Sequence, residues 1–239
     1  MSEKYDELCK EAFGASARRN PGWFHFPFPF ESAAGQELLK VAWKYDILNW
    51  RGFLQNIRDE KVPGALVEFG VFEGNALSKH IGFCDELGLS MNIHGFDSFD
   101  GLPEPSKFDL TRLWQAGKFK TNFDKVKTRV GVGKRKNVFL HRGWFCDTLA
   151  DPKVQAAIPE VAFARIDCDL YDSTMDCLRF LEGRLAHGAY LHFDDWTHDE
   201  TTGETKAFFE WLPGVESRYR FEHITSIAFG SCTFRVWWR

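Results

Sequence analysis

The sequence predicts an α/β fold built on a doubly wound, mostly parallel sheet. Five short apolar runs alternate with segments in which apolar residues recur at helical spacing. Continuous apolar runs of this length between helices are typical of parallel strands that are buried on both faces. A chain of 239 residues is also of the right size for one such domain with an appendage. The alternation therefore indicates a Rossmann-like sheet with helices on both sides.

An N-terminal unit, residues 1–62, precedes the alternating part. Residues 23–32 are aromatic and contain two prolines, which lack a backbone donor and resist regular structure. This segment is interpreted either as a lid or interface arm, or as an extended stretch packed on the domain. Residues 33–58 have apolar residues near helical spacing and predict one or two helices. We therefore expect an N-terminal helical lid segment followed by a second unit over residues 63–239.

The strands and helices of the second unit are predicted from its apolar pattern. The predicted strands are residues 65–71, 92–96, 138–141, 161–166 and 189–193. Helices are expected over residues 75–87 and 173–185, which each carry one apolar face, and the second begins with Ser173 and Asp176 in the spacing of a capping box.

The C-terminal part is predicted to differ from the parallel sheet. A helix is expected from Gly203 to Trp211, where Pro213 and the glycine after it stop it. Residues 220–228 and 232–238 are candidate strands of an antiparallel hairpin.

Composition and charge exclude several classes of function. The formal net charge is −4, which argues against nonspecific binding of nucleic acid. No apolar run is long enough to span a membrane, and no signal peptide is evident. The six cysteines form no CxxC pair and no zinc-like spacing, so reduced thiols in a cytoplasmic protein are expected.

The loop after the first predicted strand carries a glycine pattern. Ligands of open parallel sheets bind beyond the carboxyl ends of the strands. Gly70 permits a tight turn, and Gly74 permits close approach of the backbone where a helix begins, whose free N–H groups can hold a carboxylate. Phe72 replaces the second glycine of the dinucleotide fingerprint, so a diphosphate would fit poorly. The pattern also fits an ordinary turn between a strand and a helix.

Candidate nucleoside contacts follow the second and third strands. Asp97 is placed to accept both hydroxyls of a ribose, whereas Asp100 precedes a glycine and is interpreted as a turn residue. After the third strand, Gly143 would let an adenine approach the backbone and Trp144 would stack on it. Packing of Trp144 in the core is the alternative.

The fourth and fifth strands end in carboxylates. Asp167, Asp194 and Asp195 converge at one edge of the sheet if these strands are neighbours. Three carboxylates in one pocket repel each other, and a bound divalent cation resolves that conflict. Oxygen ligands select a hard ion such as Mg²⁺, Ca²⁺ or Mn²⁺. Alternatively, some of these acids cap helices or pair with Arg165, and Asp169 is assigned to a hydrogen bond within the following turn.

Five segments together resemble one known family, the TylF-type macrocin O-methyltransferases of the S-adenosylmethionine-dependent class I methyltransferases. The segments are VEFGVFEGN, GFDSFDGLPEP, HRGWFCDTL, RIDCDLYDSTMD and HFDDW. The resemblance covers about residues 64–212, and the last two motifs are its most specific part. Cys168 stands where the family has a glycine between two acids.

This resemblance implies a function and a site. The family methylates sugar hydroxyls of secondary metabolites with Mg²⁺, so Asp167, Asp194 and Asp195 are expected as metal ligands. Homo-oligomers, in which N-terminal segments close over the site, are also implied. The candidate cofactor-binding residues are Glu68, Gly70, Phe72, Glu73, Gly74, Asn75, Asp97, Ser98, Gly143 and Trp144.

The sequence therefore predicts an O-methyltransferase that uses S-adenosyl-L-methionine and a divalent metal on a hydroxyl of a sugar or glycosylated natural product. A catechol or phenolic diol as acceptor, and a non-catalytic scaffold that binds S-adenosylmethionine, are the alternatives. Asp167 is the candidate catalytic residue, both as metal ligand and as proton acceptor. His141 and His192 are rival bases, although a histidine on a strand is more often structural.

Overall fold

The computed structural model describes residues 33–111, 113–197, 199–227 and 230–239. The lid or arm predicted over residues 23–32 lies outside the described residues. The strands are β1 (Ala65–Phe69), β2 (Ile93–Asp97), β3 (Val138–Arg142), β4 (Val161–Ile166), β5 (Leu185–Phe193), β6 (Tyr219–Ile227) and β7 (Ser231–Trp238). The helices are α2 (Ala33–Glu60), α3 (Asn75–Leu87), α4 (Phe123–Val130), α5 (Phe145–Thr148), α6 (Pro152–Ala157), α7 (Tyr171–Leu181) and α8 (Gly203–Val215).

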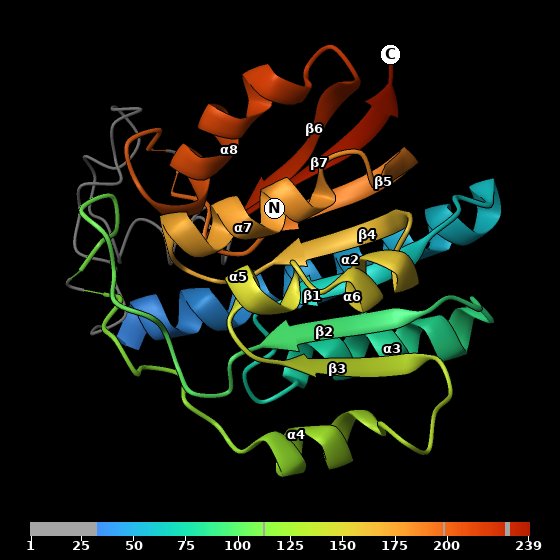
Figure 1. Cartoon of the computed structure of the whole chain (residues 1–239), viewed down its shortest axis with the longest axis horizontal. Coiled ribbons are helices and arrows are strands. Elements are labelled where there is room, and N and C mark those ends of the chain that lie inside the picture. The colour runs from blue at the N-terminus through green and yellow to red at the C-terminus, as the bar shows by residue number, and fades with distance from the viewer. Residues whose placement is uncertain (1–32, 112, 198, 228–229) are drawn as a thin grey trace.

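The strands form a seven-stranded sheet in the order β3-β2-β1-β4-β5-β7-β6. The first five strands are parallel, and the hairpin of β6 and β7 joins β5 in antiparallel orientation, with β7 between β5 and β6 (Figure 1). The predicted doubly wound sheet with a C-terminal antiparallel hairpin is confirmed. The strand order reverses between β1 and β4, which is where open sheets of this kind bind ligands.

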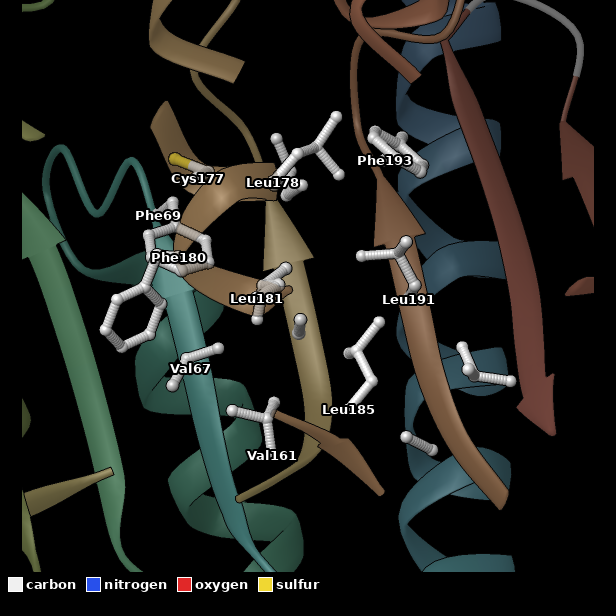
Figure 2. Packing of buried hydrophobic residues seen from close by; sticks show 14 of the residues in the cluster. Val67, Phe69, Val161, Cys177, Leu178, Phe180, Leu181, Leu185, Leu191 and Phe193 are labelled. Carbon is white, nitrogen blue, oxygen red and sulfur yellow. The ribbon is translucent and has the colours of Figure 1, made fainter. Parts of the chain in front are cut away.

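Helices cover both faces of the sheet and enclose two cores. Helices α2 and α3 lie on one face, and α5, α6, α7 and α8 lie on the other (Figure 1). Figure 2 shows the apolar side chains of α7 gathered over β1, β4 and β5, among them Leu178 and Leu181, which are completely buried. Trp50 and Leu54 of α2 are buried in the core of the opposite face. The N-terminal helix is therefore packed on the sheet, and the boundary predicted after residue 62 stays a prediction.

Most predicted elements are confirmed, but the helix predicted over residues 173–185 is wrong at both ends. Helix α7 begins at Tyr171, so Ser173 lies inside its first turn and the predicted capping box does not form. The helix ends at Leu181, and Leu185 is the first residue of β5. Gly183, which has φ 79°, turns the chain between them, although the apolar spacing continues across it.

Two other predicted limits also shift. Residues 33–60 form a single helix, which is one of the two outcomes that the sequence allowed, and it ends at Glu60 instead of residue 58. Helix α8 continues through Pro213 to Val215 instead of stopping at Trp211. A proline in the last turn removes only one hydrogen bond, because its missing N–H would have bonded the carbonyl of Phe209, four residues back. Among the described helices, none has the length and apolar character needed to cross a bilayer.

Candidate active site

A cavity of about 380 Å³ opens at the carboxyl ends of β1, β2, β3 and β4. Seven of the predicted site residues line it: Gly70, Phe72, Asp97, Ser98, Gly143, Trp144 and Asp167. The other six do not: Glu68, Glu73, Gly74, Asn75, Asp194 and Asp195. The cavity lies at the reversal of strand order, where the fold predicts a ligand.

Gly70 lets the loop after β1 cross the loop after β4. Its φ is 85°, and a Cβ atom at this position would lie 1.6 Å from the carbonyl oxygen of Asp167. A side chain is therefore excluded here, both by backbone conformation and by contact. The glycine brings the floor of the cavity next to the candidate catalytic carboxylate.

Hydrogen bonds to the Asp97 carboxylate stabilise the conformation of the same loop. Its Oδ2 accepts hydrogen bonds from the backbone N–H groups of Val71 at 2.9 Å and Phe72 at 2.7 Å, and its Oδ1 accepts one from Phe99 at 2.6 Å. Burial raises the pKa of Asp97, and these three N–H donors oppose the rise. Phe72 has φ 47°, a strained conformation for an aromatic residue that its bond to Asp97 helps to hold.

Glu68 does not reach the cavity. Its side chain is completely buried on the other side of the strand and lies 2.9 Å from Nδ1 of His80 in α3. The expectation that Glu68 lines the methionine end of a cofactor is therefore not met, because side chains of successive strand residues point to opposite faces.

The residues at the start of α3 contact α4 and do not line the cavity. Arg129 donates hydrogen bonds to the carbonyl oxygen of Glu73 and to Oδ1 of Asn75, at 2.8 and 2.7 Å. A Cβ atom on Gly74 would meet the side chains of Val126 and Val130 at 3.1 Å. The space in front of this helix is thus filled by α4, and the predicted role of Gly74 in ligand approach is not met.

Aromatic side chains form one wall of the cavity. Trp144, at the start of α5, is 41% exposed and lines the cavity, so its alternative placement in the core is excluded. Phe72 and Phe119 contact each other edge to face, with ring centroids 5.5 Å apart. Gly143 precedes Trp144 with φ 142° and lines the cavity beside it. The wall offers flat apolar surface for an adenine or a sugar ring.

Asp167 and Asp194 share one buried arginine. Arg165 donates through its two terminal nitrogens to Asp167 Oδ2 and to Asp194 Oδ1, each at 2.7 Å. The pairing with Arg165, considered as an alternative from the sequence, is therefore present. Burial would raise the pKa of Asp194, but the Arg165 guanidinium holds it below its usual range. Burial raises the pKa of Asp167, and the neighbouring Asp194 and Asp195 raise it further.

Asp169 and Asp195 form a second carboxyl pair beside the first. The two side chains are in hydrogen-bond contact, and burial together with like charge raises the pKa of both. Asp195 Oδ2 is buried and has no hydrogen-bond partner among the described residues. Asp169 also lines the cavity, and its carboxyl group contacts Asp195, whereas the sequence had offered a hydrogen bond within the following turn as the alternative. Its backbone has φ 63°, a conformation that aspartate tolerates better than most residues.

The acids at the ends of β4 and β5 have the donor chemistry that suits a divalent cation. Asp167, Asp169, Asp194 and Asp195 lie at these strand ends, with Arg165 as the cation that neutralises them among the described residues. An orphaned carboxylate oxygen and a carboxyl–carboxyl contact both indicate missing positive charge. The donors are all oxygen atoms, which suits Mg²⁺, Ca²⁺ or Mn²⁺.

A second group of possible ligands does not fit a cation. Asp46, His192 and Asp194 bring donor atoms within 4.8 Å of one another. However, Asp46 accepts a hydrogen bond from Ser231, and His192 Nε2 accepts one from the indole of Trp50. Asp194 Oδ1, the oxygen 3.7 Å from His192 Nε2, already accepts a hydrogen bond from the guanidinium of Arg165.

Neither rival base faces the cavity. His141 stacks on Phe96 with ring centroids 4.3 Å apart, and its Nε2 lies 3.0 Å from Nδ1 of His94. His192 is completely buried, with Nδ1 2.8 Å from Oγ1 of Thr233. Asp167 is the predicted base that lines the cavity.

Sequence reasoning missed several lining residues. They are Gly101, Leu102, Pro103, Glu104, Phe119, Phe145, Cys146, Cys168, Asp169, Asp172, Ser173 and Asp176. Asp169 had a usable signal, since it follows Asp167 by two residues at a strand end. Glu104 and Phe119 lie in the long irregular connection between β2 and α4, where no periodicity shows which side chains turn inward.

The sequence profile of the macrocin-O-methyltransferase (TylF) family matches residues 44–215. The chain belongs to this family. It is 30% identical over 162 residues to demethyldecarbamoylnovobiocin O-methyltransferase of Streptomyces niveus. It is 31% identical over 163 residues to 8-demethyl-8-(2,3-dimethoxy-alpha-L-rhamnosyl)-tetracenomycin-C 4'-O-methyltransferase of Streptomyces olivaceus. The resemblance seen in the sequence is confirmed.

The two alignments cover 62% and 61% of this chain, and 58% of each relative's length. Among solved structures, the O-methyltransferase NovP superposes with a TM-score of 0.68 and 25% identity, over 81% of this chain and 80% of that one. The calicheamicin methyltransferase CalS11 superposes with a TM-score of 0.65 at 21% identity, over 98% of this chain and 91% of that one, which supports the fold. This TylF-family chain thus has the Rossmann-like fold of these methyltransferases.

Proposed function

We propose that this TylF-family chain is an S-adenosylmethionine-dependent, divalent-metal-dependent O-methyltransferase whose acceptor is a hydroxyl of a sugar or of a glycosylated natural product. The observation that carries the proposal is that Asp167 and Asp169 line the cavity beside a glycine loop and an aromatic wall, with Asp195 in contact with Asp169. The names of the curated relatives, two of which are given above, support the acceptor class.

Residues on the β1, β2 and β3 side would hold the cofactor. Gly70 lines the cavity where the loop after β1 crosses the loop after β4, Asp97 is placed at the end of β2 for a ribose, and Trp144 offers its ring to an adenine. S-adenosylmethionine supplies an electrophilic methyl group on a sulfonium centre. The aromatic side chains of the wall would shield that group from water.

Residues on the β4 and β5 side would hold the metal ion. Asp167, Asp194 and Asp195 remain the proposed ligands, and Asp169 adds a fourth carboxylate beside them. A divalent cation lowers the pKa of a hydroxyl close to it. Asp167 takes up the acceptor's proton, because it lines the cavity and its Oδ2 alone is engaged by Arg165.

The charge of the cavity favours an acceptor without negative charge. Its lining carries six carboxyl side chains and, among the described residues, no lysine, arginine or histidine. Such a surface attracts the sulfonium cation and repels phosphates. We therefore place neutral or amino-sugar glycosides above nucleotide sugars as acceptors. A homo-oligomeric assembly and a cytoplasmic location stay predictions.

An acceptor panel tests the proposal. Neutral glycosides, amino-sugar glycosides, nucleotide sugars and catechols are incubated with methyl-labelled S-adenosylmethionine, with Mg²⁺ or with excess chelator. Label is expected in a glycoside hydroxyl, and chelator is expected to abolish the transfer. Undiminished transfer in chelator would contradict the metal requirement, catechol-only transfer would contradict the acceptor class, and tight cofactor binding without any product would favour a scaffold.

A further inference from the structure

Glu204 is a buried acid that the proposed chemistry does not use. It lies in the first turn of α8 and its side chain is completely buried. No ion pair to Glu204 occurs among the described residues, and it does not line the cavity. Burial of an unpaired carboxylate is costly, so its hydrogen bonds must compensate.

Both oxygens of Glu204 accept hydrogen bonds from backbone N–H groups of two different loops. Oε1 accepts from Cys168 at 3.2 Å, and Oε2 accepts from Asp195 at 3.0 Å. Cys168 stands between Asp167 and Asp169 in the loop after β4, and Asp195 belongs to the loop after β5. One carboxylate therefore ties together the two loops that carry the candidate metal ligands.

Arg165 provides a second link between the same two strand ends. Arg165 joins the side chains of Asp167 and Asp194 from within the sheet. Arg165 fixes side chains, whereas Glu204 fixes the backbone. Helix α8 is itself anchored, since the N–H of Gly203 donates to the carbonyl of Phe108 at 2.9 Å and Thr205 Oγ1 accepts from the N–H of Thr197 at 2.9 Å.

We propose that Glu204 is a positioning residue that sets the spacing between the loop of Asp167 and Asp169 and the loop of Asp194 and Asp195, and thereby the affinity of the site for a divalent cation. The inference rests on the proposed function. Its physical basis is that two backbone N–H donors from different loops find their acceptors on one carboxyl group, so the position of that group fixes the distance between the two loops. Loss of a hydrogen bond that holds a metal-ligating residue in place typically changes metal affinity by about 10- to 100-fold.

Glu204→Gln is the direct test, because it keeps the side-chain shape but turns an NH₂ group toward one of the two backbone donors. Glu216→Gln is the matched control, since it removes the same charge from the exposed C-terminal end of α8. Free Mn²⁺ is measured by electron paramagnetic resonance during titration of each protein. The dissociation constant of S-adenosylmethionine is measured by calorimetry on the same samples.

We expect Glu204→Gln to raise the dissociation constant of Mn²⁺ about tenfold or more, while cofactor affinity stays within about twofold and Glu216→Gln matches the wild type. Glu204→Asp, whose shorter side chain keeps the charge but cannot reach both donors, is expected to give a smaller loss and serves if the glutamine variant does not fold. Wild-type Mn²⁺ affinity in either folded variant would overturn the inference, as would equal losses of Mn²⁺ and cofactor affinity, which indicate a general folding defect.

Failure of the proposed function has a different result. A wild-type protein that binds S-adenosylmethionine but no Mn²⁺ would overturn the metal requirement and this inference with it. A wild-type protein that binds Mn²⁺, together with Glu204 variants that bind it equally well, would overturn the inference alone.

Discussion

The carboxylate at the end of β2 and the carboxylates at the ends of β4 and β5 lie at the same edge of the sheet in different surroundings. Asp97 receives three backbone N–H donors, so its charge is matched by the loop it organises. The four aspartates beyond β4 and β5 share one guanidinium, and one of their oxygens has no partner among the described residues.

This difference separates an acid whose charge the surrounding loop satisfies from acids whose charges, in our proposal, a divalent cation would neutralise. A satisfied buried carboxylate stabilises the fold, whereas crowded and unpartnered carboxylates destabilise it until a cation binds. Stability and function should therefore respond in opposite ways to neutralising the two groups. The following substitutions test this contrast, beginning with the one expected to have the largest effect.

Asp167→Asn should lower the rate of methyl transfer by about 10³-fold, within the range expected for loss of a base. The amide cannot take up a proton and is a weaker metal ligand. Cofactor affinity should survive, because the Gly70 loop and Trp144 are unchanged. Steady-state kinetics and calorimetry measure the two quantities. Asp172→Asn, which neutralises an exposed acid on the same cavity, is the control and should retain most of the rate.

Asp97→Asn should lower the free energy of unfolding by about 1–3 kcal/mol. The two carboxylate oxygens of Asp97 accept hydrogen bonds from three backbone N–H groups. The amide of asparagine has one acceptor oxygen, so at least one of these donors loses its partner. Urea denaturation measures the change. The neighbouring exposed Asp100→Asn should stay within about 0.5 kcal/mol of the wild type. Equal free energies of unfolding for the two variants would show that the hydrogen bonds of Asp97 do not stabilise the fold.

Trp144→Ala extends the contrast to the aromatic wall. Loss of a stacking surface typically costs about 1–3 kcal/mol per base, so the KM for S-adenosylmethionine should rise about tenfold with kcat little changed. Trp144→Phe keeps a ring and should recover most of the affinity. An unchanged KM in the alanine variant would show that the ring does not contact the cofactor.

Asp195→Asn should have the smallest effect of the four substitutions. It should change the free energy of unfolding of the metal-free protein in the opposite direction to Asp97→Asn. The amide donates to the Asp169 carboxylate and removes one of the crowded charges, so the free energy of unfolding should rise by up to about 1 kcal/mol. Thermal unfolding with and without Mg²⁺ measures it. Added Mg²⁺ should stabilise the wild type more than the variant, and a destabilised metal-free variant would contradict our interpretation.

The apolar pattern predicted the sheet well because buried parallel strands leave continuous apolar runs. Strand β4 and helix α3 have the predicted limits. The limits of α7 were wrong because Leu185 happens to continue the helical spacing across Gly183, and the turn there depends on the meeting of α7 and β5. Spacing along a chain records periodicity, but it does not record where a tertiary contact ends a helix.

Only part of the candidate site could be predicted, because the sequence pattern locates strand ends but does not record tertiary contacts. Strand ends can be located from sequence, and the predicted Asp97, Asp167 and Trp144 do line the cavity. Glu68 was misplaced because its alternation puts it on the α3 side of β1. Glu204 was not found, because nothing in its sequence neighbourhood shows that α8 inserts its first turn between two loops.

The sequence by itself determined the alternation of strands and helices, the acids at the strand ends and the family. Only the tertiary structure decided which acids are satisfied and which are crowded. The physical reason is that a carboxylate's state depends on donors and charges from distant segments, such as the N–H groups of the β1 loop, the guanidinium of Arg165 and the carboxylate of Glu204. Their distances exist only once the strands are side by side.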